Sequence, residues 1–128
     1  MADTRGTVLV VDDQADERRI QGAMLAHLGF AVREAGDGIS AVAAAVGDPP
    51  DLVLLDVSMP RMDGFEVCRA LRADPRTADI PVLFLTASTA MDVAARATEA
   101  GAQGCLTKPI DPREVAETVA RLVVLPGT

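Results

Sequence analysis

Short, solid runs of apolar residues alternate along this chain with longer segments in which apolar and polar residues are mixed. The clearest run is Leu52 to Leu55, which ends on Asp56 and is followed by Pro60 and Asp63-Gly64. Such a run is typical of a strand buried on both faces of a parallel sheet, and the proline and glycine predict a turn after it. Comparable runs predict strands at Val8 to Val11 and Ile80 to Leu85, and we expect a mixed strand at Phe30 to Ala35 and a short one at Gly104 to Thr107.

The segments between these runs have the apolar spacing of amphipathic helices. We expect helices over Asp16 to Leu28, from Asp37-Gly38 onward, over Phe65 to Ala73, over Ala90 to Ala100, and from Asp111 or Pro112 onward. The apolar positions that predict buried helix faces are Ile20, Met24 and Leu28, then Ile39, Val42, Ala43 and Val46, then Val67, Cys68 and Leu71, and finally Val115, Val119 and Leu122. The helix over Ala90 to Ala100 is mostly alanine, so it buries little area per turn.

Alternation of strand and helix predicts a parallel sheet with right-handed crossovers and helices on both faces. The second strand mixes Phe30 and Val32 with Glu34, as an edge strand would. The common doubly wound order for five strands is 2-1-3-4-5, which puts the second strand at an edge. The expected fold is therefore α/β, a flavodoxin-like doubly wound (βα)5 three-layer sandwich with a parallel five-stranded sheet in order 2-1-3-4-5.

Composition narrows the classes of partner. At 128 residues the chain is expected to be one domain, residues 1–128, with an ordered core of about residues 6–125. Its net charge of −7 argues against direct binding to nucleic acid or to an anionic membrane. No apolar run approaches the roughly 20 residues that a membrane span needs. Cys68 and Cys105 have no metal-ligand spacing and lie in apolar runs, which favours reduced core thiols in a cytoplasmic protein.

Polar residues with complementary charges stand at the ends of four predicted strands. Asp12-Asp13 follow the first strand, Asp56 ends the third, Thr86 ends the fourth and Lys108 follows the fifth. In the predicted order the first and third strands are neighbours, and ligands of open α/β sheets bind outside the carboxyl ends of strands at that reversal. We therefore expect three carboxylates, a hydroxyl and an ammonium to converge there.

This set of groups suits phosphoryl transfer. Three adjacent carboxylates repel one another unless one is protonated or a cation lies among them. Oxygen ligands select a hard ion such as Mg²⁺, and Asp12, Asp13 and Asp56 could hold it. An aspartate is also a competent nucleophile toward phosphorus, and Thr86 and Lys108 could contact the transferred phosphoryl oxygens.

Four motifs carry a resemblance to a known family. They are VLVVDD at Val8 to Asp13, LLDVSMPRMDG at Leu54 to Gly64, LTAS at Leu85 to Ser88 and LTKP at Leu106 to Pro109. With these motifs in this order, the whole chain resembles a response-regulator receiver domain of two-component signal transduction.

The resemblance implies a role for each residue of the site. Asp56 is the implied phosphoacceptor. Mg²⁺, with Mn²⁺ as a substitute, is implied to be held by Asp12, Asp13, Asp56 and the backbone carbonyl of Ser58, with Asp13 a more direct ligand than Asp12. The implied phosphoryl contacts and switch residues are Thr86, Ala87 and Lys108. The peptide bond before Pro109 is implied to be cis.

The resemblance also implies partners. The phosphodonor would be a sensor histidine kinase or a histidine phosphotransfer protein, and the output would pass to a downstream effector domain or protein. The domain would signal rather than act as an enzyme, while assisting its own phosphorylation and dephosphorylation. We expect a cytoplasmic protein that is a monomer or a weak dimer.

One position departs from the family pattern. Three residues before Lys108 the family usually has Tyr or Phe, and here the residue is Cys105. A small thiol displaces little when it moves, so we hypothesise that switching relies on the helix over Ala90 to Ala100 rather than on a ring flip. Gln103-Gly104 stand where many dimerising regulators carry paired acids, which weakens the case for a dimer.

Two other functions are open to a chain of this pattern. A phosphatase of the haloacid-dehalogenase type also uses Asp, Thr, Lys and Mg²⁺, but it places its nucleophile at the first strand in an Asp-x-Asp arrangement. A flavodoxin-like carrier of FMN would need a hydroxyl-rich phosphate loop and usually aromatic rings, whereas the chain has Asp12-Asp13 at that place and no Trp or Tyr.

Overall fold

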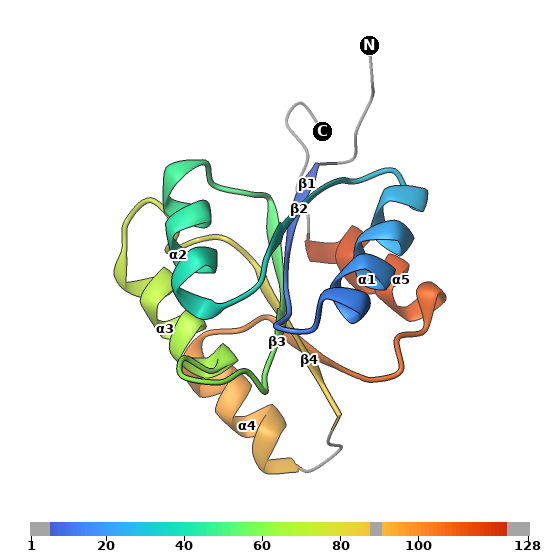
Figure 1. Cartoon of the computed structure of the whole chain (residues 1–128). Coiled ribbons are helices and arrows are strands. Elements are labelled where there is room, and N and C mark those ends of the chain that lie inside the picture. Colours follow the sequence, from blue (N-terminus) through green and yellow to red (C-terminus); the bar gives the residue numbers. More distant parts are fainter. Residues whose placement is uncertain (1–5, 88–90, 123–128) are drawn as a thin grey trace.

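The computed structural model describes residues 6–87 and 91–122, which build a parallel five-stranded sheet between two layers of helices (Figure 1). The strands are β1 (Thr7–Val11), β2 (Ala31–Ala35), β3 (Leu52–Asp56), β4 (Val82–Thr86) and β5 (Gly104–Thr107). The helices are α1 (Ala15–His27), α2 (Gly38–Gly47), α3 (Gly64–Ala73), α4 (Met91–Ala100) and α5 (Pro112–Leu122). The strand order is β2-β1-β3-β4-β5, so the predicted order and fold class are confirmed.

Some predicted boundaries differ or fall outside the described residues. β4 begins at Val82 rather than Ile80, because Ile80 belongs to the preceding turn, where its N–H donates to the Thr77 carbonyl at 3.2 Å. Ser88 and Ala90 lie outside the described residues, as do residues 123–125 at the end of the expected ordered core.

The core has two halves, one on each face of the sheet. Leu9 and Val11 of β1 face a cluster that contains buried residues of α2, α3 and α4. Val8 and Val10 face the opposite cluster, which contains Leu25 of α1 and residues of α5. Successive residues of a strand point to opposite faces, so one continuous apolar run supplies both halves of the core. Figure 1 shows the same division, with α2, α3 and α4 on one side of the sheet and α1 and α5 on the other.

The predicted buried face of α1 is wrong at Ile20, whereas Met24 and Leu28 pack against the core as predicted, although they are only partly buried. Ile20 is 66% exposed, and Met24 and Leu28 are only half-buried, whereas Gln21, Gly22 and Leu25 are buried. A Cβ added to Gly22 would lie 3.3 Å from the Val32 side chain of β2. Because Gly22 has no side chain, α1 can approach the sheet on this face. The helix is therefore rotated so that Gln21 and Leu25 face the sheet and Ile20 faces solvent.

The predicted buried face of α2 is wrong at Ile39 and Ala43, which are exposed, whereas Val42 packs against the core and is half-buried. Ile39 is 73% exposed, and the residues that α2 buries are Gly38, Ala41 and Ala45. A Cβ added to Gly38 would lie 2.9 Å from side-chain atoms of Met62 and Val67, so this end of α2 packs in close contact with its neighbours. The larger apolar residues of α2 instead line a shallow groove beside α3, with Met62 and Ala70 on its other wall.

The predicted faces of α3 and α5 are confirmed. Val67, Cys68 and Leu71 of α3 are buried, as are Val115 and Val119 of α5. β2 is an edge strand in which only Ala35 is fully buried, as its mixed sequence predicted.

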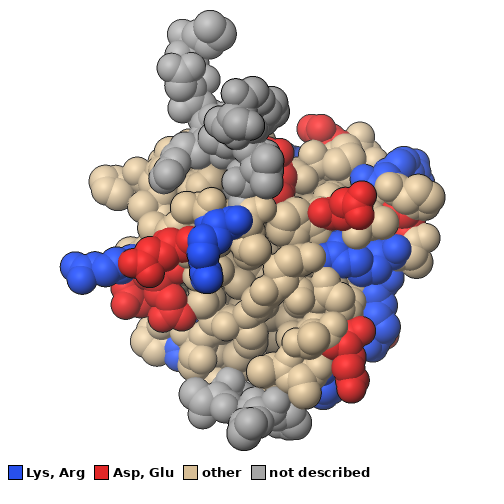
Figure 2. Space-filling model, turned by 180° about the vertical axis from the view of Figure 1, so that it is seen from behind, with Lys and Arg blue, Asp and Glu red and all other residues tan. Residues whose placement is uncertain are grey.

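One face of the molecule carries charges of both signs. Seen from behind, acidic and basic side chains lie close together at both sides of the molecule, with a broad uncharged area between them (Figure 2). Among the described residues, no helix is both long enough and apolar enough to cross a bilayer.

Candidate functional site

The carboxyl ends of four parallel strands bring the predicted site residues to one edge of the sheet. Asp12 directly follows β1, Asp56 is the last residue of β3, Thr86 is the last residue of β4 and Lys108 directly follows β5. The backbone N–H of Lys108 donates to the Thr86 carbonyl at 2.7 Å, which joins the ends of β4 and β5. β1 and β3 are neighbours at the point where strand order reverses, so the site lies where a doubly wound sheet binds ligands.

Three carboxylates form a compact cluster. One oxygen each from Asp12, Asp13 and Asp56 can be chosen so that all three lie within 4.8 Å of one another. Asp12 and Asp56 are buried, and Asp13 is exposed at the mouth of the cluster. This all-oxygen donor set fits a hard divalent cation such as Mg²⁺, which also relieves the repulsion among the carboxylates.

The surroundings of the Asp56 carboxyl disfavour its ionised form. Burial raises its pKa to about 6, with Asp12 adding to the rise, while Lys108 and the hydrogen bond from the Ser58 N–H oppose it. The Ser58 N–H lies 3.3 Å from Asp56 Oδ1. A cation bound beside Asp56 would favour its ionised form, which is the form that can act as a nucleophile.

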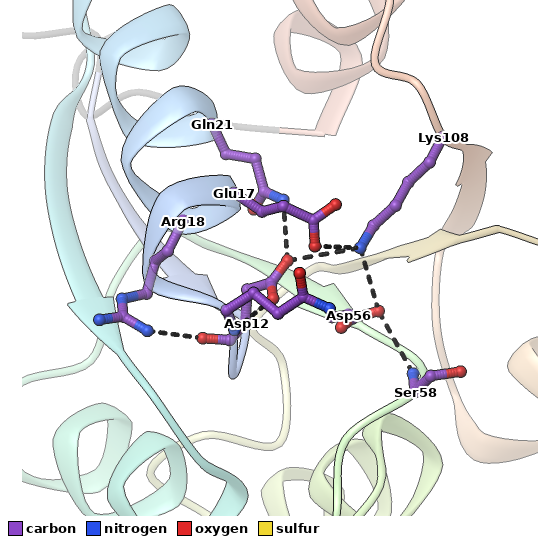
Figure 3. Close-up of polar contacts among 8 residues, drawn as sticks. Asp12, Glu17, Arg18, Gln21, Asp56, Ser58 and Lys108 are labelled. Atoms are coloured by element: carbon purple, nitrogen blue, oxygen red, sulfur yellow. Dashed lines mark hydrogen bonds and ion pairs between the residues drawn. The ribbon is translucent and has the colours of Figure 1, made fainter.

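Lys108 lies among three carboxylates (Figure 3). Its Nζ is 3.2 Å from Glu17 Oε2, 3.4 Å from Asp12 Oδ2 and 3.5 Å from Asp56 Oδ1. Burial alone would lower the pKa of Lys108, but the charges of Asp56, Asp12 and Glu17 outweigh burial and raise it. Lys108 is therefore an ammonium group next to the Asp56 carboxylate. The peptide bond between Lys108 and Pro109 is cis.

Asp12 is held by donors on both of its oxygens. The Gln14 N–H donates to Oδ1 at 2.9 Å, and Gln21 Nε2 donates to Oδ2 at 3.0 Å. Arg18 Nη1 also donates to the Asp12 backbone carbonyl at 2.7 Å, while its Nε pairs with Glu34 on β2. Asp12 is thus fixed by α1 and by the turn that leads into it (Figure 3).

The loop after β3 folds back under Asp56 because residue 64 is glycine. A Cβ at Gly64 would lie 2.6 Å from the Asp56 carbonyl oxygen and 2.9 Å from Val57 Cα. α3 starts here with a capping box, in which the Asp63 carboxylate accepts from the Glu66 N–H and the Glu66 carboxylate accepts from the Asp63 N–H. The Asp-Gly pair therefore both caps α3 and allows the close approach beneath Asp56.

Other predicted residues surround this centre. Ser58 and Ala87 are exposed, and the Thr86 residue is buried at the end of β4. Cys105 is half-buried, opposite Phe84 in the β4–β5 ladder, and packs on the side of the sheet that α4 covers. Burial raises the pKa of the Cys105 thiol. Cys105 is therefore less enclosed than the fully buried Cys68, although both were predicted to be core thiols.

The sequence prediction missed two residues of the site, Glu17 and Gln21. Both come from α1, one helical turn apart; Gln21 contacts Asp12 of the cluster, and Glu17 contacts Lys108. Asp13, Glu17 and Gln21 follow one another at intervals of four residues. Residues four apart share a helix face, so this spacing could have predicted that Glu17 and Gln21 lie near the site. The signal was obscured by Ile20 and Met24, which were assigned to the buried face.

Comparison with known proteins identifies the family. The sequence model of the response regulator receiver domain matches residues 8–120. The chain is 41% identical over 116 residues to the DNA-binding dual master transcriptional regulator RpaA of Synechocystis, and the match covers 91% of this chain and 48% of RpaA. It is 47% identical over 104 residues to the response regulator PleD of Caulobacter vibrioides, covering 81% of this chain and 23% of PleD. The chain thus spans half or less of the length of these relatives.

Solved structures agree with the sequence relatives. Chemotaxis protein CheY4 of Vibrio cholerae superposes with a TM-score of 0.87 at 34% identity, over 91% of this chain and 98% of that one. The receiver domain of the sensor histidine kinase PA1611 from Pseudomonas aeruginosa, a structure with a magnesium ion coordinated in the active site cleft, gives a TM-score of 0.85 at 30% identity, over 91% and 96%. From its strand order, its motifs and these matches, the chain belongs to the response regulator receiver domains of two-component signalling.

Proposed function

We propose that this receiver domain accepts a phosphoryl group on Asp56. The observation that carries the proposal is the position of Asp56 at the end of β3, where its carboxylate lies beside those of Asp12 and Asp13 and 3.5 Å from the Lys108 ammonium. Family membership favours this function over a dehalogenase-type phosphatase or an FMN carrier. The proposal treats residues 1–128 as one receiver domain.

The donor is a phosphohistidine of a sensor histidine kinase or a histidine phosphotransfer protein. A carboxylate oxygen of Asp56 attacks phosphorus, the P–N bond breaks, and the imidazole leaves with the electron pair and takes up a proton. The product is an acyl phosphate on Asp56. Water later attacks the same phosphorus and breaks the bond to the Asp56 oxygen, which restores the carboxylate and releases inorganic phosphate.

The other site residues would hold the metal ion or contact the phosphoryl group. Asp12, Asp13, Asp56 and the Ser58 backbone carbonyl would hold Mg²⁺, or Mn²⁺ in its place, and the bound ion would supply neutralisation of phosphoryl charge. Lys108 is close enough to Asp56 to meet a second phosphoryl oxygen. Thr86, with the exposed Ala87 after it, would contact a third and report the change to the surface. In this way the domain assists its own phosphorylation and dephosphorylation.

The acyl phosphate shifts a population between two surface conformations, which an effector domain or protein distinguishes. RpaA is a DNA-binding regulator that extends beyond the matched region, so an effector on a longer chain is one form this output can take. The proposal places the domain in the cytoplasm as a monomer or a weak dimer, and the two unpaired cysteines support a reducing location.

Labelling by acetyl phosphate tests this function. Intact mass spectrometry should find one added phosphoryl group when acetyl phosphate and Mg²⁺ are both present, and the Asp56→Asn variant should show none while keeping its circular dichroism spectrum. The exposed Asp79→Asn variant is the matched control and should label like the unmodified protein. Labelling that persists in Asp56→Asn would refute the proposal.

A further inference from the structure

Glu17 is an acid of the site that lies outside the carboxylate cluster. It belongs to the first turn of α1, and its Oε2 is 3.2 Å from Lys108 Nζ. Of the three carboxylates around the ammonium, Glu17 makes the shortest contact. Its side chain is 37% exposed, compared with 18% for Lys108. The pair therefore lies at the rim of the site rather than in its centre.

We propose that Glu17 is a positioning residue that retains the Lys108 ammonium beside α1 when a divalent cation binds the cluster, and thereby strengthens cation binding. This inference rests on the proposed function, because it takes Asp12, Asp13 and Asp56 as the cation site. It concerns the protein before phosphorylation.

Lys108 needs a separate counter-charge because the ammonium and a divalent cation would use the same carboxylates. Lys108 now contacts Asp12 and Asp56, and both belong to the cluster that fits the cation. A divalent ion repels the ammonium and competes for both acids. Among the described contacts of Lys108, Glu17 is the one acid that the cluster does not include, so the ammonium keeps a counter-charge when it gives up the other two.

The surroundings of Glu17 suit this role. Asp12 keeps its hydrogen bonds from Gln14 and Gln21 when Lys108 shifts, so the Asp12 carboxylate stays in its orientation toward the cation. Arg18, the next residue of α1, joins the Asp12 carbonyl to Glu34 and so fixes the turn that carries Glu17. Figure 3 shows Glu17 and Lys108 approaching each other from α1 and from the segment after β5.

Two alternative roles for Glu17 fit the same contact. Glu17 could attract the cation directly by its charge, without the help of Lys108. Alternatively, the contact could be a rim ion pair of no consequence, as many exposed pairs are. A second acid on the same turn supplies the matched control, because Asp16 is 96% exposed at its side chain and pairs only loosely with Arg19, at 3.9 Å.

The experiment is a titration of unphosphorylated protein with Mn²⁺ and with Mg²⁺, monitored by isothermal titration calorimetry at physiological ionic strength. Glu17→Gln should raise the dissociation constant about threefold to fivefold, the size of a partly exposed charge contact. Asp16→Asn removes the same charge one residue away and should leave the constant nearly unchanged, because solvent and salt screen it. Equal constants for the two variants would overturn the inference.

A double-mutant cycle shows whether Glu17 acts through Lys108. In a Lys108→Met background, Glu17→Gln should produce no further change beyond that of Asp16→Asn. An equally large shift in both backgrounds would mean that Glu17 acts on the cation directly, which also overturns the inference. If the unmodified protein binds neither cation, the inference fails as well. Acetyl phosphate labelling of Asp56 is scored separately, so failure of either proposal can be told from failure of the other.

Discussion

At the scale of single residues, the site places charges where they are unfavourable until a ligand arrives. Asp56 is buried beside a second buried carboxylate, and one ammonium is shared between Asp12, Glu17 and Asp56. Gln21 lowers the stability of the folded protein further, since its Oε1 is buried without a hydrogen-bond partner among the described residues. A fold that tolerates this arrangement gives up stability in return for a carboxylate ready to bind a cation and attack phosphorus.

The first prediction follows from the raised pKa of Asp56, about 6 in the folded protein against an ordinary value of 3.8. A carboxyl whose pKa is higher in the folded state favours folding below pH 3.8 and loses this contribution as pH rises through 6. Ionised Asp56 therefore destabilises the metal-free protein at neutral pH. Asp56→Asn should raise the free energy of unfolding by about 2 kcal/mol at about pH 7.5, and the gain should disappear near about pH 4.

Urea unfolding in the presence of a chelator, followed by circular dichroism, measures this gain at each pH. Circular dichroism is required because the chain has no Trp. Asp13→Asn is a control, since Asp13 belongs to the same cluster but is exposed. A gain for Asp56→Asn that does not depend on pH would contradict the electrostatic explanation.

At the scale of helices and strands, close contacts at two glycines determine how α1 and the loop after β3 pack around the site. Gly22 lets α1 approach β2, with Glu17 turned toward Lys108, Gln21 toward Asp12 and Ile20 toward solvent. Gly64 lets the loop after β3 pass directly beneath Asp56 before α3 begins. The geometry of the site thus depends on two glycines that carry no chemistry of their own.

The second prediction compares two glycines. Gly64→Ala should lower the free energy of unfolding by about 2 kcal/mol, because its Cβ would meet the Asp56 carbonyl oxygen at 2.6 Å and the backbone must shift. Labelling by acetyl phosphate should slow as well, since Asp56 is the residue displaced. Gly47→Ala is the matched control: its Cβ meets nothing within 4 Å, and it should be neutral or stabilising by up to about 1 kcal/mol.

Urea unfolding and acetyl phosphate labelling of both variants provide the measurement. The close approach at Gly64 would be unimportant if the two alanine variants had the same unfolding free energy and the same labelling rate.

At the scale of the whole molecule, the question is how a change at Asp56 reaches a surface that a partner can read. β4 and β5 link the site to the face that α4 covers, and Cys105 lies on this path opposite Phe84. A thiol in place of a ring moves little volume, so we propose that the switch relies on α4. Among the α4 side chains that the structure describes, the buried ones are Ala97 and Ala100, and Val93 packs half-buried against the same cluster, so we expect a shift of this helix to disturb little buried area.

The third prediction concerns the reactivity of the Cys105 thiol. In a Cys68→Ala background, its rate of modification by a thiol reagent should be the same with and without beryllium fluoride and Mg²⁺. Cys105 is half-buried in the structure, so both protection and exposure would be detectable. Strong protection on adding beryllium fluoride would mean that Cys105 turns inward as a ring does, against the role proposed for α4.

Local pattern alone determined much of this protein. Runs such as Leu52 to Leu55 predicted the strands, and their alternation with helices predicted a parallel sheet. The common doubly wound order and the mixed second strand predicted the strand order, and parallel strands bring Asp12, Asp56 and Lys108 to one edge. These predictions succeed because a strand's burial and its last residue are both visible in a short stretch of sequence.

Only the tertiary structure decided which side of α1 and of α2 is buried. Apolar spacing selected Ile20 and Ile39, but both are exposed, because close packing at Gly22 and Gly38 sets the rotation of these helices. Glu17 and Gln21 enter the site through that rotation. The space available beside a glycine is a property of the surface it meets, which lies elsewhere in the chain, so no local pattern contains it.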